Sequence, residues 1–179
     1  MIRPVSVRPK PQNNYAKGLF FALLATAAAI SVWYFSLDRY KGVVGMAALC
    51  VITAALFVYT KYISQQYIYD ITEDYKGSPI LVVRAVTGKR ESTMCRVDLS
   101  SIISVEKESR EQRKAHKTPT GYNKYVYSPT VMPDEVYRVT VSSRYEKAEI
   151  IIECSEEFAS LLSAYANEAR ELYSSLEEE

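Results

Sequence analysis

Most residue patterns that mark a catalytic or metal site are missing from this sequence of 179 residues. It has one histidine, His116, and three cysteines, none of which forms a C-x-x-C pair. A zinc site would therefore need mostly carboxylates or distant thiols. The chain also lacks a Walker loop and the motifs G-x-S-x-G, H-E-x-x-H and G-x-G-x-x-G. These absences indicate a protein without catalysis, without a cofactor and without an evident small-molecule substrate.

A strong excess of charge of either sign is also missing. The net charge is +1, which predicts no strong attraction to nucleic acid. The bases are unevenly placed, since residues 1–17 carry four bases and no acid: Arg3, Arg8, Lys10 and Lys17. Residues 1–16 also contain three prolines and no apolar period, so we expect a disordered basic arm. Such an arm either lies on anionic lipid or serves only as a topology signal.

Two long apolar runs occupy residues 18–37 and 43–61. Apart from Lys61 at the end of the second run, neither contains an acidic residue, a lysine, an arginine or a histidine. At 1.5 Å per residue, each can cross a hydrocarbon core of roughly 30 Å. Only residues 38–42 separate them, so we predict an antiparallel transmembrane hairpin over residues 17–63. Because transport pathways usually need ionisable groups inside the membrane, the hairpin is interpreted as a tether.

Aromatic and small residues support this hairpin. Aromatic side chains that suit the membrane interface stand near the ends of the runs: Trp33, Tyr34 and Tyr40 at one end, Tyr15, Tyr59 and Tyr62 at the other. Small residues are expected to let the helices approach closely: Ala22, Ala25 and Ala29 on the first, Gly45, Ala48 and Ala55 on the second.

A cleaved signal peptide is the rival interpretation of the first run, because residues 27–29 are alanines. The run is too long for a signal peptide, and it ends in the bulky residues 33–35. Lys and Arg counts, four before the first helix against two in the link, favour both termini in the cytoplasm. We therefore predict a two-span protein of the cell membrane. A disulfide between Cys95 and Cys154 would need an oxidising compartment, so unreactive buried thiols are expected.

From residue 66 the apolar period changes to that of β-strands. Strands are predicted over residues 66–71, 80–86, 92–99, 102–106, 123–131, 136–142 and 148–154. A helix follows, capped by Ser155, with one apolar face: Phe158, Leu161, Leu162, Tyr165, Ala169 and Leu172. The sequence thus predicts an α+β domain over residues 66–176. About seven antiparallel strands would form a bent sheet or partly open barrel, closed by the C-terminal helix.

This layout resembles the pleckstrin-homology (PH) fold, and in detail the bacterial PH-like domains attached to paired transmembrane helices, the YcxB-like type. The segments that carry the resemblance are residues 97–106, 125–127, 132–133, 137–139 and 150–154. The resemblance implies a cytoplasmic, membrane-tethered interaction domain.

The segment from residue 107 to 127 is the main candidate contact surface, and we predict that it is a long loop. Its candidate residues for contact with lipid or a partner are Arg110, Arg113, Lys114, Lys117, Tyr122, Lys124 and Tyr125. Bases would meet lipid phosphates or a partner, and tyrosines would lie among the headgroups. The alternative is a solvated loop whose tyrosines fold onto the sheet. A second basic group, Arg84, Lys89, Arg90 and Arg96, is interpreted as ordinary solvated charge near a turn.

These features together favour a membrane-anchored interaction or scaffold module at the cytoplasmic membrane surface. Its expected partners are membrane lipids and a protein partner or a second copy of the chain. The alternative is a structural or regulatory subunit of a larger membrane complex.

Overall fold

The computed structural model describes residues 4–9, 14–36, 40–143 and 146–177, and the side chains within these ranges except those of residues 36 and 173–177. The chain divides into two compact units. The helical unit contains residues 11–65 and 129–131, and the β unit contains residues 1–10, 66–128 and 132–179.

The helical unit is a hairpin of two apolar helices. Helix α1 spans Asn14–Ser36, α2 spans Lys41–Val58, and the π-helix η1 continues α2 over Tyr59–Ser64. The Phe20 and Tyr59 rings lie 5.5 Å apart at one end, and a Cβ atom on Gly45 would lie 3.6 Å from Tyr34 at the other. The helices are therefore antiparallel, as the short link predicts. Both are long and apolar enough to cross a membrane.

The helix contact uses small residues at the predicted positions on α2 but not on α1. On α2, Gly45 and Ala48 are half-buried and Ala55 is buried, as predicted. On α1, the prediction is wrong, because Ala22, Ala25 and Ala29 are exposed. The inward positions are instead Phe20, Leu23, Ala27 and Ile30. Of these, Ala27 is the most buried at 5% exposed, so a small residue also lies on the α1 side of the contact.

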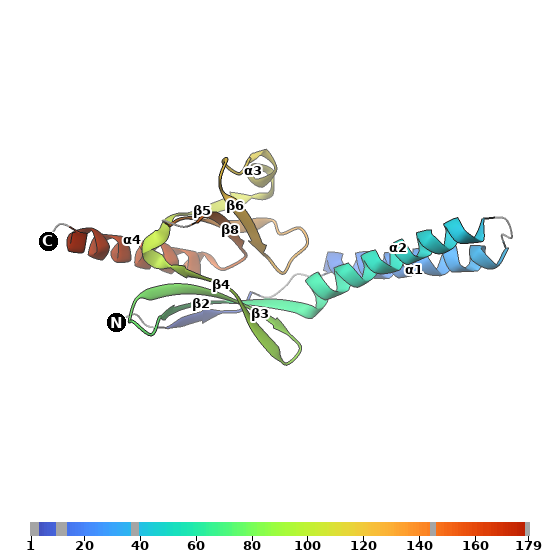
Figure 1. Ribbon diagram of the computed structural model, residues 1–179, viewed down its shortest axis with the longest axis horizontal. Helices are drawn as coiled ribbons and strands as arrows, with labels where there is room; N and C mark the ends of the chain where they lie inside the picture. Colours follow the sequence, from blue (N-terminus) through green and yellow to red (C-terminus); the bar gives the residue numbers. More distant parts are fainter. Residues whose placement is uncertain (1–3, 10–13, 37–39, 144–145, 178–179) are drawn as a thin grey trace. The chain divides into compact units, whose positions relative to one another are not determined.

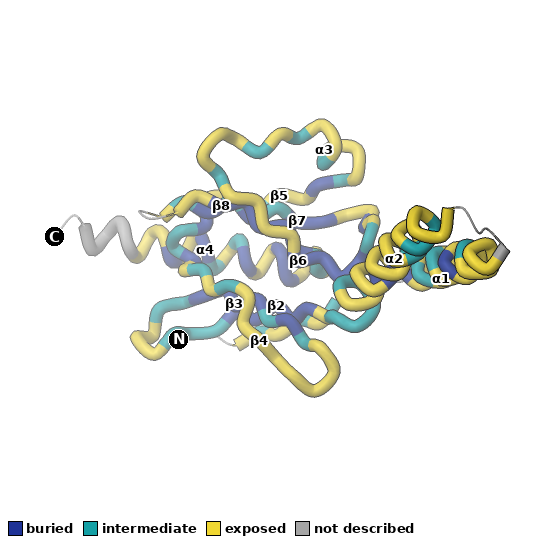
Figure 2. The backbone as a smooth tube through the Cα atoms, turned by 45° about the vertical axis from the view of Figure 1, so that its right-hand side comes forward, coloured by how far each residue is buried: buried dark blue, intermediate teal, exposed yellow. Residues whose placement is uncertain are grey.

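The outer surface of the hairpin is apolar and exposed. Figure 2 shows both helices mostly in the exposed colour. The long side chains left uncovered lie on all sides of the hairpin and include Leu19, Phe21, Leu24, Val32, Trp33, Phe35, Val43, Met46, Leu49, Ile52, Leu56 and Phe57. A water-soluble monomer rarely exposes an apolar surface of this extent.

The β unit contains two four-stranded sheets. Sheet A has the order β1 (Val5–Val7), β2 (Gln65–Glu73), β3 (Pro79–Thr87) and β4 (Arg90–Asp98). Sheet B has the order β5 (Ile102–Ser109), β7 (Glu135–Ser142), β8 (Lys147–Ile152) and β6 (Asn123–Tyr127). A 3₁₀ turn, η2 (Leu99–Ser101), joins the two sheets, and α4 (Glu156–Glu177) follows β8.

Helix α4 closes the core of the β unit. It lies between the two sheets in both views (Figure 1, Figure 2). Its apolar face contributes Phe158, Ala159, Leu162, Ala166 and Ala169 to a core that also draws on both sheets. The Phe158 amide donates to Ser155 Oγ at 3.3 Å, which confirms the predicted cap.

The N-terminal arm corrects one prediction. Residues 5–7 form β1, which pairs antiparallel with β2, with Val5 opposite Ile71 and Val7 opposite Tyr69. The expectation of disorder is wrong for these residues, because the two valines alternate with Ser6 and pack against the core. Residues 1–3 and 10–13 of the arm lie outside the described residues.

The sheets differ from the prediction in further respects. The strands form two four-stranded sheets, where a bent antiparallel sheet or a partly open barrel was predicted, and β6 pairs parallel to β8. Strand β6 ends at Tyr127 instead of residue 131, since Pro129 cannot donate a ladder hydrogen bond. The expected long loop is partly ordered: β5 runs to Ser109, and helix α3 (Arg110–Ala115) follows with a Ser109–Gln112 capping box.

Candidate functional site

The segment from residue 110 to 122, here called the basic lobe, covers the face of sheet B that is turned away from the core. In Figure 1 and Figure 2, α3 and α4 lie on opposite sides of this sheet. Along β7, the core residues Tyr137 and Val139 alternate with Arg138, so Arg138 points toward the lobe. Two acids on neighbouring strands, Glu108 and Glu149, are almost completely buried on this side.

A polar network fastens the lobe to the sheet. His116 Nε2 lies 2.8 Å from Glu149 Oε1, and the Thr118 hydroxyl donates to Glu149 Oε2 at 2.9 Å. Arg138 Nη1 donates to His116 Nδ1 at 3.0 Å, and Arg138 Nη2 donates to Glu108. Because arginine has no acceptor, His116 Nδ1 must accept, and its Nε2–H donates to Glu149.

The charges in this network are largely hidden from water. Glu108 and Glu149 are each 2% exposed. The Arg138 guanidinium donates both to Glu108 and to His116, which in turn contacts Glu149. Burial alone would raise the pKa of Glu149. Hydrogen bonds from His116 and Thr118, with the positive charge of Arg138, outweigh burial, so the pKa lies below its usual value. Each buried carboxylate thus has a hydrogen-bond donor, and the network holds the basic lobe against sheet B.

The lowered pKa of Glu149 gives a prediction about acid stability. Its stabilising contribution is present above the ordinary carboxyl pKa of about 4.3 and disappears as the pH falls through the lower folded-state value. In circular dichroism melts of the full chain in mild detergent, we expect wild type to lose more stability between about pH 5 and pH 3 than Glu149→Gln does. Equal slopes for the two proteins would contradict this account.

The predicted contact residues are divided by the structure into free and engaged groups. Arg110, Lys114, Lys117 and Lys124 are exposed, and of these the Arg110 guanidinium is engaged, since it donates to Met132 Sδ at 3.3 Å. Arg113 is half-buried, and its guanidinium donates to the Pro133 carbonyl at 3.0 Å. The exposed face of the lobe therefore presents bases.

The two candidate tyrosines differ in exposure. Tyr122 is half-buried, with Lys147 Nζ 6.0 Å from its ring centre, whereas Tyr125 is exposed and its hydroxyl donates to Glu146 at 2.8 Å. Only Tyr122 agrees with the alternative in which the tyrosines fold onto the sheet.

The candidate membrane-interface aromatics lie near the ends of the hairpin. Trp33 and Tyr34 are in the last turn of α1, and both are exposed. Tyr59 and Tyr62 are in η1, where Lys61 Nζ lies 5.6 Å from the Tyr62 ring centre. Aromatic side chains thus stand at both ends of the apolar surface.

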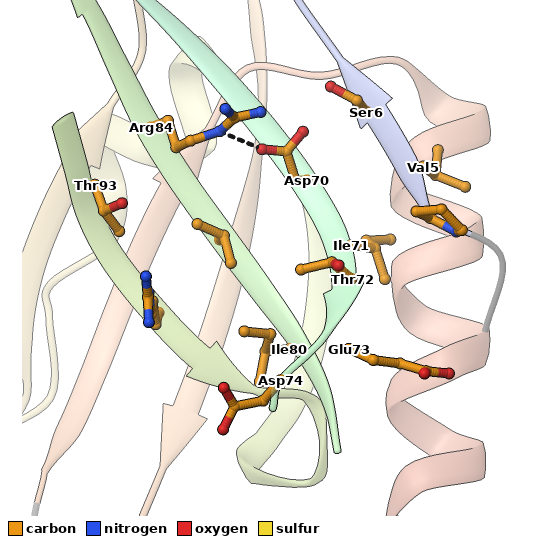
Figure 3. Close-up of a pocket in the computed structure, with 13 residues that line it drawn as sticks. Val5, Ser6, Asp70, Ile71, Thr72, Glu73, Asp74, Ile80, Arg84 and Thr93 are labelled. Atoms are coloured by element: carbon orange, nitrogen blue, oxygen red, sulfur yellow. Dashed lines mark hydrogen bonds and ion pairs between the residues drawn. The ribbon is translucent and has the colours of Figure 1, made fainter. Parts of the chain in front are cut away.

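Sheet A carries a separate polar feature that the sequence did not reveal. A groove of about 470 Å³ lies on its outer face, and Figure 3 shows Asp70 and Arg84 joined in it. Arg84 Nε lies 2.6 Å from Asp70, and Nη1 lies 2.8 Å from Glu91. The prediction that Arg84 is merely solvated is wrong, and the alternation of Asp70 with the core residues Tyr69 and Ile71 is the signal that could have placed it on this face.

The thiols and acids offer no alternative site within the described part of the chain. All three cysteines are free, and the expectation of buried thiols is wrong for Cys50, which is exposed. Burial raises the pKa values of Cys95 and Cys154 to about 11 and about 12, so both stay protonated near neutral pH. No group of three His, Cys, Asp or Glu residues that could hold a metal ion occurs among the described residues.

Comparison with known proteins adds no further constraint on this site. No protein-family model matches the chain, and no curated protein matches it.

Proposed function

We propose that this chain is a membrane-anchored interaction module with a PH-like domain, which acts without catalysis at the cytoplasmic surface of the cell membrane. The single observation that carries the proposal is the exposed apolar hairpin joined without a linker to a folded β unit. Strand β2 begins at Gln65, directly after η1 ends at Ser64.

The pairing of strand β1 argues against removal of the first helix as a signal peptide. It lies before α1 in the chain and pairs with β2 after the hairpin. Cleavage of a signal peptide within α1 would remove β1 from sheet A and uncover an edge of β2. The same pairing supports a topology in which both ends of the chain are on one side of the membrane.

The basic lobe is proposed as the surface that contacts an acidic protein partner. Its exposed bases supply charge, and the buried network beneath it holds them in place. Because Tyr122 is half-buried and the Tyr125 hydroxyl is engaged by Glu146, we favour a protein partner over insertion of this surface among lipid headgroups.

Crosslinking in native membranes tests the proposed partner. The full chain would be crosslinked and purified in mild detergent as wild type, Lys114→Gln/Lys117→Gln, and the matched control Lys89→Gln/Arg90→Gln. Exposed ion pairs are worth up to about 1 kcal/mol each, so the lobe variant should lose about five- to thirty-fold in partner yield. The control, with the same loss of charge, should retain the partner. Equal yields from wild type and the lobe variant would refute the role of the lobe.

The second candidate is a subunit of a larger membrane complex. The exposed small-residue face of α1, formed by Ala22, Ala25 and Ala29, favours it, because such faces let a neighbouring helix approach closely. The same purification separates the two candidates. A fixed-ratio complex that survives the lobe variant indicates contact through the helices and supports the subunit.

A further inference from the structure

Strand β4 forms one edge of sheet A, and among the described strands it pairs only with β3. The other edge strands are β1, β5 and β6, and β4, with nine residues, is the longest of the four. Its register with β3 is regular from Asp98 to Cys95 and shifts at Met94, which forms a bulge. Because a bulge disrupts pairing where it stands, the regular part of this edge is residues 95–98.

A cleft of about 370 Å³ runs along this edge. Five consecutive β4 residues line it, from Met94 to Asp98. Consecutive side chains of a strand point to opposite faces, so a cleft lined by all five lies along the backbone edge and not on one face. The Asp98 carbonyl is already engaged, since it accepts from Ser101 Oγ at 2.7 Å, and it marks the end of the open edge.

The far wall of the cleft is apolar. It contains Tyr125 and Tyr127 of β6, and the core residues Val141 and Ile150 reach it from β7 and β8. All of these residues belong to the β unit. The cleft is thus an open side of the space between the two sheets, where an apolar side chain would meet the core.

The side chains of the open edge alternate between the core and solvent. Cys95 and Val97 pack against the core, whereas Arg96 and Asp98 are exposed. Neither Arg96 nor Asp98 forms an ion pair with another described residue. A base and an acid two residues apart on one face are placed to pair with an acid and a base on a neighbouring strand.

We propose that the edge of β4 at residues 95–98 binds an extended segment of a protein partner, which adds to sheet A as an antiparallel strand. The backbone of the segment would pair with the open edge, and every second side chain would enter the apolar cleft. Read from its N-terminus, the segment would carry a base, an apolar residue, an acid and an apolar residue, opposite Asp98, Val97, Arg96 and Cys95. A lipid or a small solute offers no such ladder of backbone groups. This surface is separate from the basic lobe and adds a second contact to the proposed interaction module.

The test is an NMR titration of the full chain in mild detergent with short capped peptides. The first peptide has the sequence Thr-Lys-Val-Glu-Leu-Thr, and the second exchanges the charges, Thr-Glu-Val-Lys-Leu-Thr. Two further forms of the first peptide carry backbone N-methyl groups, one form on Lys and Glu, the other on Val and Leu. Because the amides of a strand point alternately to its two sides, only one of these forms blocks the hydrogen bonds to β4.

We expect the first peptide to move the amide signals of residues 94–98, 125 and 127, and to bind about five- to thirty-fold more tightly than the second. One N-methylated form should lose binding, and the other should retain it. The variant Arg96→Glu/Asp98→Lys keeps the net charge and should prefer the second peptide by a similar factor. The matched control Lys107→Glu/Glu135→Lys exchanges an exposed ion pair on sheet B and should leave the preference unchanged.

Three results would refute the proposal and leave the membrane anchorage untouched: equal affinity for the two charged peptides, equal behaviour of the two N-methylated forms, or no movement of the 94–98 amides. Movement of the same amides on dilution of the peptide-free chain would assign the edge to a second copy of the chain, and the proposal would then also be wrong.

Discussion

Replacing Arg138 with alanine is expected to destabilise the β unit by about 3 to 5 kcal/mol. Glu108 is 2% exposed and accepts a hydrogen bond from this guanidinium, and His116 Nδ1 accepts a second. Without Arg138, a buried carboxylate keeps its charge or takes up a proton, and either outcome costs free energy. Circular dichroism melts of the full chain in mild detergent would measure a fall in Tm of more than about 10 °C.

Two variants control for this effect. Arg90→Ala removes an exposed arginine without an ion pair among the described residues, so it should change stability by less than about 0.5 kcal/mol. The double variant Arg138→Met/Glu108→Leu removes both charges and should recover part of the loss. If Arg138→Ala lost no more than Arg90→Ala, the network beneath the lobe would not be a structural fastening.

The single variant Phe158→Ala is expected to lower the free energy of unfolding by about 3 to 5 kcal/mol. Phe158 is 1% exposed, lies in the first turn of α4 and stacks at a tilt against Tyr69, with ring centres 6.3 Å apart. The truncation would leave a cavity where α4 meets β2. Chemical denaturation followed by far-ultraviolet circular dichroism would show the lower midpoint.

The matched control for Phe158 stands one turn further along the same helix. Leu161 is 39% exposed, so Leu161→Ala should cost less than about 1.5 kcal/mol. Similar losses in the two variants would mean that α4 does not close the core through its inward face.

Local sequence patterns were sufficient for the elements but not for their pairing. The period-two pattern predicted a strand near every one of β2 to β8, and the helical pattern with Ser155 predicted α4. Strand β1 was missed because three residues are too few to show a period-two pattern of apolar residues, and prolines and bases surround them. Val5 and Val7 become a strand only through the edge of β2, which is more than fifty residues away in the chain.

The polar network beneath the basic lobe could not be predicted either, because its partners are far apart in the sequence. His116 is 33 residues from Glu149, and Glu108 is 30 residues from Arg138. A lone histidine in a basic segment shows no acidic partner nearby, and only the order of strands in sheet B brings these side chains together. The bases of the lobe could be read directly from the sequence, whereas the half-buried position of Tyr122 and the engaged hydroxyl of Tyr125 depend on contacts with Lys147 and Glu146.

Cysteine accessibility in intact cells tests the central claim most directly. In a chain whose Cys50, Cys95 and Cys154 are replaced, single cysteines at the exposed positions Ser6, Gly42 and Ser160 would be treated with a membrane-impermeant maleimide. A membrane-anchored module with both ends in the cytoplasm predicts labelling at position 42 from outside, and labelling at 6 and 160 only after permeabilisation. Labelling of position 160 in intact cells, or of 6 and 160 on opposite sides, would contradict the account.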